Sequence, residues 1–188
     1  MLIREAQREV RTVFMGGFAG QLVSAALWAT SAALATWSTP GRAIAVLVVG
    51  GMFIFPLTQW LLRALGRRAS LGSANPMHQL AMQVAFTLPL NLPVAAAATL
   101  YRLEWFYPAV MVLLGTHYLP FAFLYGMWQF LVLGGVLVAA GLAIALYVPG
   151  TFALGGWVTA ALLLVFAAVG RSATARSAGP VAAVPDRG

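Results

Sequence analysis

Long apolar stretches alternate with short polar breaks along the whole chain. Six such stretches cover residues 12–37, 43–65, 76–100, 106–125, 128–148 and 151–170. A helix of about 20 apolar residues crosses a hydrocarbon layer about 30 Å thick, so each stretch is long enough to span a membrane. Apolar residues run continuously rather than in the alternation typical of a membrane β-barrel. The pattern therefore predicts an all-α integral membrane bundle of six transmembrane helices.

Composition agrees with this interpretation. Hydrophobic residues make up 62% of the 188 positions and charged residues only 8%, whereas soluble domains have about 45–50% apolar and about 25% charged residues. The chain has no cysteine, which excludes disulfides and thiolate metal sites. Its net charge of +7 comes from arginines that interrupt apolar stretches instead of forming one face, so we expect no nucleic-acid partner.

Arginine placement predicts the orientation, because short cytoplasmic loops retain positive charge. If the N-terminus lies inside, only Arg42 and Arg102 fall outside. The other nine arginines then fall inside: Arg4, Arg8, Arg11, Arg63, Arg67, Arg68, Arg171, Arg176 and Arg187. We therefore expect a multi-pass protein of the cell inner (plasma) membrane, surrounded by the lipid bilayer, with the N-terminus and C-terminus cytoplasmic.

The two ends of the chain differ from the spans. In residues 1–11, Leu2, Ile3, Ala6 and Val10 share one helical face and charged residues take the others, which predicts an interfacial amphipathic helix. Residues 12–170 form the predicted six-helix transmembrane domain. Residues 171–188 are rich in Ala, Ser, Pro and Arg without periodicity, which predicts a disordered cytoplasmic tail.

Polar residues inside the spans form the candidate site. Gln79, Gln83, Thr87 and Asn91 recur every four residues and fit within an arc of about 120° on one helix. An amide that faced lipid would cost several kcal/mol, so we expect these side chains to point into the bundle. The candidate ligand-binding set combines part of this row with polar residues of other spans: Gln21, Ser24, Gln59, Gln83, Thr87, Asn91, His117 and Tyr118.

Prolines and glycines add two expectations. Pro89 and Pro93 each remove a backbone hydrogen bond, which predicts either local unwinding that lines a cavity or an ordinary kink. In the first span, Gly16, Gly20 and Ser24 follow a four-residue spacing that is typical of close helix packing. That packing is either intramolecular or the face of a homo-oligomer.

The sequence offers few residues that could support enzyme catalysis. All four acidic residues lie outside the predicted spans, so paired carboxylates and acidic metal sites are missing from the membrane interior. Ser24 and His117 lie at a similar predicted depth, but Ser24 lacks the Gly-x-Ser motif, with a later histidine, of rhomboid-type intramembrane proteases. We expect no catalytic residue, no bound metal and no cofactor.

The sequence leaves two functions open. The first is a protein that binds or translocates a small neutral or weakly polar molecule along the candidate ligand-binding residues, which we call the polar seam. His117 could both donate and accept hydrogen bonds there. The alternative is a non-transporting membrane sensor, scaffold or partner subunit, in which the polar residues bond one another and serve structure only.

One resemblance concerns the third and fourth stretches. Residues 115–121 read Gly-Thr-His-Tyr-Leu-Pro-Phe, Leu124-Tyr125-Gly126 follow, and Asn75-Pro76-Met77 begin the third stretch. This pattern resembles small uncharacterised bacterial polytopic membrane proteins. The resemblance implies no catalytic or binding residue, and it marks these two stretches as the informative centre of the chain.

Overall fold

The computed structural model describes residues 1–67 and 70–177, and its regular secondary structure is helical throughout these ranges. The α-helices are α1 (Ile3–Val13), α2 (Phe18–Trp37), α3 (Pro40–Gly51), α4 (Ile54–Ala64), α5 (Met77–Tyr101), α6 (Phe106–Tyr125), α7 (Gln129–Tyr147) and α8 (Leu154–Ser177). Short 3-10 turns, η1 (Met15–Gly17) and η2 (Leu103–Trp105), lie directly before α2 and α6. The predicted all-α class is confirmed for the part of the chain that the structure describes.

Five helical segments are long and apolar enough to cross a membrane: Met15–Trp37, Met77–Tyr101, Leu103–Tyr125, Gln129–Tyr147 and Leu154–Ala175. The helices α3 and α4 pass the same test only as a pair, bent by 61° at the break between them. Gly50 and Gly51 end α3, and Pro56 stands in the first turn of α4, where a missing backbone N–H is tolerated. The described residues thus hold five candidate spans, or six if the bent pair is one span.

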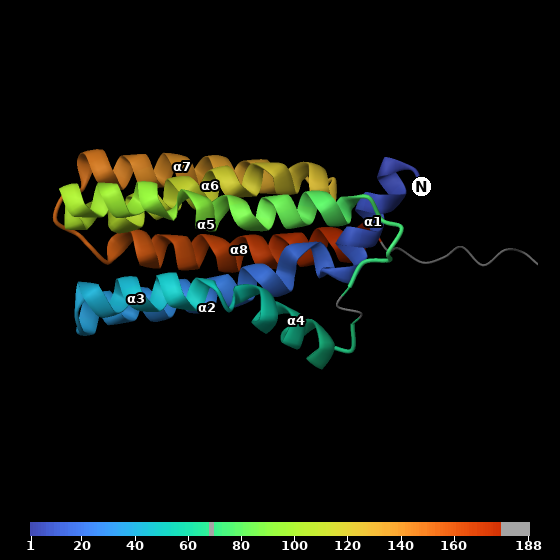
Figure 1. Ribbon diagram of the computed structural model, residues 1–188, viewed down its shortest axis with the longest axis horizontal. Coiled ribbons are helices and arrows are strands. Elements are labelled where there is room, and N and C mark those ends of the chain that lie inside the picture. Colours follow the sequence, from blue (N-terminus) through green and yellow to red (C-terminus); the bar gives the residue numbers. More distant parts are fainter. Residues whose placement is uncertain (68–69, 178–188) are drawn as a thin grey trace, which may run out of the picture.

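The long helices run side by side in two groups (Figure 1). In one group α6 packs against both α5 and α7, and in the other α2 packs against α3, α4 and α8. Because α8 also packs against α7, it joins the two groups. α5 lies at an edge, with α6 as its main neighbour, and α4 diverges from the rest of the bundle (Figure 1).

Glycines allow close contact between α6 and α7. A Cβ atom added to Gly115 of α6 would lie 2.7 Å from the carbonyl oxygen of Gly134 in α7, and a Cβ on Gly134 would lie 2.7 Å from the Gly115 carbonyl oxygen. The two backbones therefore touch, as small residues permit in membrane proteins. Met111, Leu133 and Leu137 from the same two helices are fully buried in the core.

The first span begins later than predicted, at Met15 instead of residue 12. Met15, Gly16 and Gly17 have positive φ values of 53°, 64° and 86°. Glycine adopts such values at little cost, so the Gly-Gly pair permits a break between α1 and α2. The apolar stretch of the sequence is continuous across this break, which is why hydropathy alone did not locate it.

α1 packs its apolar face against the end of the bundle. Ala6 and Val10 are at most 1% exposed. Arg11 Nη1 donates to the carbonyl oxygens of Tyr125 at 2.8 Å and Gly126 at 3.3 Å. A positive charge at this C-terminal end of α6 also complements the helix dipole. Whether α1 lies in a membrane interface, as expected, stays a prediction.

The predicted disordered tail is corrected for its first residues, because α8 continues through Arg171 to Ser177. No glycine or proline interrupts this extension, and alanine and arginine favour helix. Thr174 Oγ1 donates to the carbonyl oxygen of Gly170 at 2.9 Å within it. The rest of the predicted tail, residues 178–188, lies outside the described residues.

α5 continues as one helix through Pro89 and Pro93. Side chains near the prolines add hydrogen bonds to its backbone: Thr87 Oγ1 donates to the Val84 carbonyl oxygen at 2.7 Å, and Asn91 Nδ2 donates to the Thr87 carbonyl oxygen at 2.7 Å. Of the two interpretations that the sequence left open, local unwinding is therefore wrong.

Candidate functional site

The predicted ligand-binding residues fall into two groups. The first group, which we call the α2–α4 site, consists of Gln21 and Ser24 on α2 with Thr58 and Gln59 on α4. Gln21 is 4% exposed, and Ser24 and Gln59 are each 8% exposed. Three of these four residues were predicted from the sequence to bind a ligand.

The α2–α4 site holds buried polar atoms without partners. Gln21 Oε1 and Thr58 Oγ1 are both inaccessible and accept no hydrogen bond from the described residues. A buried polar atom left unpaired costs about 1–3 kcal/mol. An amide oxygen can only accept, whereas a hydroxyl can accept or donate. Each of the two atoms could accept a hydrogen bond from a small partner that carries an N–H or O–H group.

Small residues bring α4 to the polar face of α2. A Cβ on Gly20 would lie 3.8 Å from Thr58 Oγ1, and a Cβ on Gly50 would overlap Leu27 Cδ1. Gly20 thus leaves α4 room to approach at Thr58, and Gly50 leaves room for Leu27 just before the bend. Ser24 stands four residues after Gly20, on the same side of α2, and Gln21 stands about 100° further around the helix than Gly20.

The second group, which we call the α5–α6 site, is centred on Thr87. Its Oγ1 lies 2.8 Å from His117 Nδ1 and donates to the Val84 carbonyl oxygen. A hydroxyl has one proton, and Thr87 uses it to donate to the Val84 carbonyl oxygen. Thr87 Oγ1 therefore accepts from His117, and Nδ1–H of His117 is the donor. The Nε2 atom of His117 then carries a lone pair. Asn91 reaches this group only through the Thr87 backbone carbonyl.

Aromatic rings occupy the path between the two groups. A Cβ on Gly17, the last residue of η1 before α2, would lie 2.9 Å from Phe130 Cζ. The Phe130 ring stacks on the Tyr118 ring with 6.0 Å between centroids, and the Tyr118 ring is edge-on to His117, also at 6.0 Å. Tyr118, a predicted ligand contact, is 6% exposed and belongs to this aromatic cluster. The expected single seam is thus divided.

The row of amides on α5 does not point into the bundle as expected. Gln79, Gln83 and Asn91 are exposed, and Thr87 is half-buried. The buried residues of α5 are Met77, Val84 and Ala95, which lie on the face toward α6. Because α5 stands at an edge of the bundle, a stripe that is offset from this face stays uncovered.

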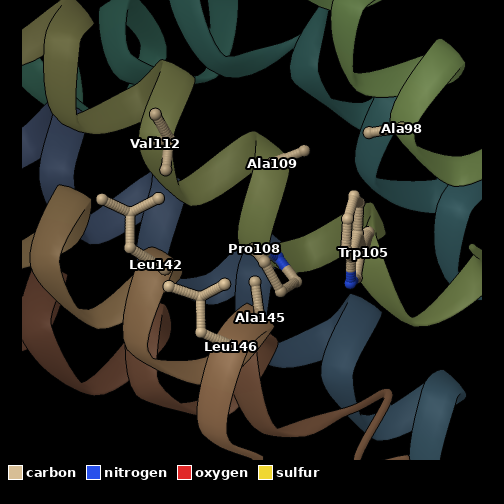
Figure 2. A pocket seen from close by; sticks show the side chains of 9 residues that line it. Ala98, Trp105, Pro108, Ala109, Val112, Leu142, Ala145 and Leu146 are labelled. Carbon is tan, nitrogen blue, oxygen red and sulfur yellow. The ribbon is translucent and has the colours of Figure 1, made fainter. Parts of the chain in front are cut away.

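A hollow with apolar walls lies at the other end of α5 (Figure 2). It has a volume of about 220 Å³ and is formed by α5, η2, α6 and α7: Ala98, Trp105, Pro108, Ala109, Val112, Gly141, Leu142, Ala145 and Leu146. Trp105 Nε1 is buried and makes no hydrogen bond with the residues that the structure describes. The side chains that line the hollow are apolar and include no titratable group, so the hollow suits a hydrocarbon group.

Other chemistry receives little support from the described ranges. No three His, Cys, Asp or Glu residues come together there in a way that could hold a metal ion. His117 hydrogen-bonds Thr87, and no bond joins it to Ser24. The prediction missed Thr58, since one hydroxyl in an apolar stretch is a weak signal. In the sequence, only the position of Thr58 next to Gln59 indicated that it could belong to the site.

One family model matches the chain, that of a family of unknown function, DUF7010, over residues 3–171. No curated protein and no solved structure matches it. The expected resemblance to an uncharacterised family is confirmed. The comparison supplies no binding or catalytic residue, so the function has to be argued from the side chains of this chain.

Proposed function

Because the chain belongs to the DUF7010 family, whose function is unknown, we propose a function from the geometry of its polar groups. The protein is a bacterial inner-membrane protein that binds or translocates a small neutral or weakly polar molecule at the α2–α4 site. The observation that carries this proposal is that Gln21 Oε1 and Thr58 Oγ1 are each buried without a hydrogen-bond partner among the described residues. A ligand with N–H or O–H groups would remove their desolvation cost.

We propose six spans with both termini in the cytoplasm. In Figure 1, α3 starts where α2 ends, and α4 returns toward the end where α1 lies, so the bent pair carries the chain from one end of the bundle to the other. Gly16 next to α1 lies against Gly170 and Thr174 of α8, which supports termini at the same end. The arginine-rich segments gather at that end, as positive charge does on the cytoplasmic side.

The bend between α3 and α4 allows α4 to move relative to α2 and so to open the α2–α4 site. α4 packs mainly on α2, and its link to α3 consists of Met52 and Phe53, whose side chains are both exposed. A rigid-body movement of α4 away from α2 would open the polar face of α2, and hinges of this kind are found at the ends of elements. Binding requires only the closed site, whereas translocation also requires this movement.

A thermal-shift measurement on the protein in lipid nanodiscs tests the proposal, with glycerol and acetamide as small neutral probes. We expect Gln21→Leu to raise the stability without probe by about 1–3 kcal/mol, because the unpaired amide disappears. The same variant should abolish the stabilisation that a probe gives to the wild type. The control is Thr30→Val, because Thr30 is exposed on α2 and bonds only its own backbone.

A density map of the same sample, inspected beside Gln21 and Thr58, supplies the second readout. Density for a small molecule, together with probe stabilisation that Gln21→Leu removes, would support the proposal. A site closed by direct side-chain contacts, with no probe effect in the wild type, would refute it. Swelling of protein-containing liposomes in glycerol then separates translocation from binding.

A second candidate, a sensor, scaffold or partner subunit, rests on the α5–α6 site. There the hydroxyl of Thr87 pairs with Nδ1 of His117, and Asn91 Nδ2 bonds its own helix. Polar groups that pair in this way act as links between membrane helices. We therefore assign this second group a structural role and keep ligand binding for the α2–α4 site.

A further inference from the structure

The hollow between α5, α6 and α7 follows one face of α6 (Figure 2). Trp105, Pro108, Ala109 and Val112 line it at the helical spacing i, i+3, i+4 and i+7. Because a helix rises by about 1.5 Å per residue, this row of residues extends over about 10 Å. The hollow therefore extends along the helices, which is also the direction of the acyl chains in a bilayer.

Small residues leave this space open. Ala98, Ala109, Gly141 and Ala145 line the hollow, and none of them has a side chain longer than one methyl group. The volume of about 220 Å³ is below the about 300–1,000 Å³ that is typical of small-molecule pockets. A buried water needs about two to four polar partners, and the side chains of these four residues offer none. The space thus suits a slender hydrocarbon chain.

One end of the hollow lies where the candidate spans end. Ala98 stands three residues before the end of α5, Trp105 directly precedes α6, and Leu146 stands one residue before the end of α7. These three helix ends lie at the same end of the bundle (Figure 1). Tyr101 and Tyr147, the last residues of α5 and α7, are 78% and 79% exposed, as is common for tyrosine at the boundary between hydrocarbon and water. The hollow thus begins near this boundary and continues into the hydrocarbon layer.

Polar groups gather at the boundary end of the hollow. The Arg102 guanidinium carbon lies 5.8 Å from the centroid of the Trp105 ring, and the Arg102 side chain is 49% exposed. Its only ion-pair partner among the described residues is Glu104, at 3.6 Å, which is longer than a direct hydrogen bond. A guanidinium suits a phosphate, and an indole N–H can donate to a carbonyl oxygen. The site thus offers donors at one end and only apolar side chains at the other.

We propose that the hollow holds one acyl chain of a membrane glycerophospholipid. The chain lies along Ala109 and Val112, and the phosphate lies at the boundary beside Arg102. The ester carbonyl stands between the two, and a small rotation of the partly exposed Trp105 ring presents Nε1 to it. The order of groups in the lipid then matches the order of groups in the site. The α2–α4 site belongs to other helices, so this proposal and the proposed function fail separately.

Native mass spectrometry of the protein in dodecyl maltoside tests the proposal, with phosphatidylethanolamine as the probe. Ala145→Phe places a ring in the hollow. Ala85→Phe is the matched control, because Ala85 is exposed on α5 and lies about 20 Å along that helix from Ala98. We expect Ala145→Phe to weaken lipid binding by roughly tenfold for every two methylene groups that it displaces. The control should bind the lipid as the wild type does.

The same measurement tests the polar end. We expect Trp105→Phe, which keeps a ring but removes the N–H, to weaken binding about fivefold. Arg102→Gln should weaken the binding of phosphatidylethanolamine but not that of dioleoylglycerol, which has the ester groups and no phosphate. Equal losses for the two lipids would overturn the assignment to a phospholipid.

Photo-cross-linking of the wild type decides the matter if Ala145→Phe does not fold. A phosphatidylethanolamine with a diazirine on its acyl chain, added to the protein in detergent in equimolar amount, should label Val112, Leu142 and Leu146. Labelling spread over α2, α4 and α8 would overturn the proposal. So would a wild type that retains no phospholipid, or equal retention by Ala145→Phe and Ala85→Phe.

Discussion

The contact of Gly115 with Gly134 shows how much one methyl group matters where two helices touch. The atom that a new side chain would meet is a carbonyl oxygen of the neighbouring backbone, which cannot turn away as a flexible side chain can. Gly135, the next residue along α7, has nothing within 4 Å of its added Cβ. Gly134 therefore packs against α6, whereas a side chain at Gly135 would meet no neighbouring atom within 4 Å.

We expect Gly115→Ala to lower the free energy of unfolding by about 1–3 kcal/mol, the usual cost of overpacking. Gly135→Ala should leave it unchanged or raise it by up to about 1 kcal/mol, because alanine restricts the unfolded chain. Denaturant titration in mixed micelles measures both. Equal effects of the two substitutions would mean that the helices separate easily at this contact.

At the scale of elements, α1 acts as a brace on the α4–α5 loop. Glu9 Oε1 accepts from the Gly72 backbone N–H at 2.6 Å, and Glu9 Oε2 accepts from Asn75 Nδ2 at 2.9 Å. Asn75 is 3% exposed, and its Oδ1 accepts from the Met77 N–H at 2.9 Å, at the start of α5. The Asn75 side chain thus connects α1 to the first residue of α5.

This brace predicts a dependence on pH. The hydrogen bonds from Gly72 and Asn75 favour the charged carboxylate and lower the pKa of Glu9 below its ordinary 4.5. A lowered folded pKa contributes stability above the ordinary pKa, and this contribution is lost as the pH falls through the folded value. We expect the wild type to lose more thermal stability than Glu9→Gln between pH 6 and about pH 3.

Glu104→Gln is the control for this experiment, since Glu104 pairs with Arg102 far from α1. It keeps the Glu9 brace and should show the pH profile of the wild type. Identical profiles for the wild type and Glu9→Gln would show that the brace contributes no stability of its own.

The sequence predicted long elements better than their breaks. Apolar length alone identified the five clear spans, because hydrocarbon thickness dictates it. The break before α2 comes from positive φ values at Met15, Gly16 and Gly17, and the bend between α3 and α4 falls at Met52 and Phe53. Neither feature changes the hydropathy of the sequence. The outward position of Gln79 and Gln83 depends on which helix becomes α5's neighbour. A helical period defines a stripe on a helix but not what covers it.

For the whole molecule, the number of crossings depends on the bent pair of α3 and α4. If the pair is one span, Ser73 lies on the cytoplasmic side, whereas Ser38 and Thr151 lie outside. If the pair turns back within the membrane, Ser73 shares the side of Ser38. All three residues are exposed and lie in the connections between helices.

We expect an impermeant maleimide to label Ser38→Cys and Thr151→Cys in intact cells, and Ser73→Cys only after the cells are opened. The cysteine-free background makes each label specific. Labelling of Ser73→Cys from outside would contradict the proposed six crossings, and it would reassign α3 and α4 to a re-entrant segment.

The brace made by α1 also constrains how the protein is synthesised. Gln7 bonds the carbonyl oxygen of Phe123, 116 positions later in the chain, and Arg11 bonds that of Tyr125, 114 positions later. At about 5–20 residues per second, ribosomes make this length in roughly 6–23 seconds. During that interval the first helix to be translated has none of its α6 partners. α1 can therefore dock only after α6 has been made, although it is translated first, and a chain truncated before α6 ends leaves its Arg11 without those carbonyl partners.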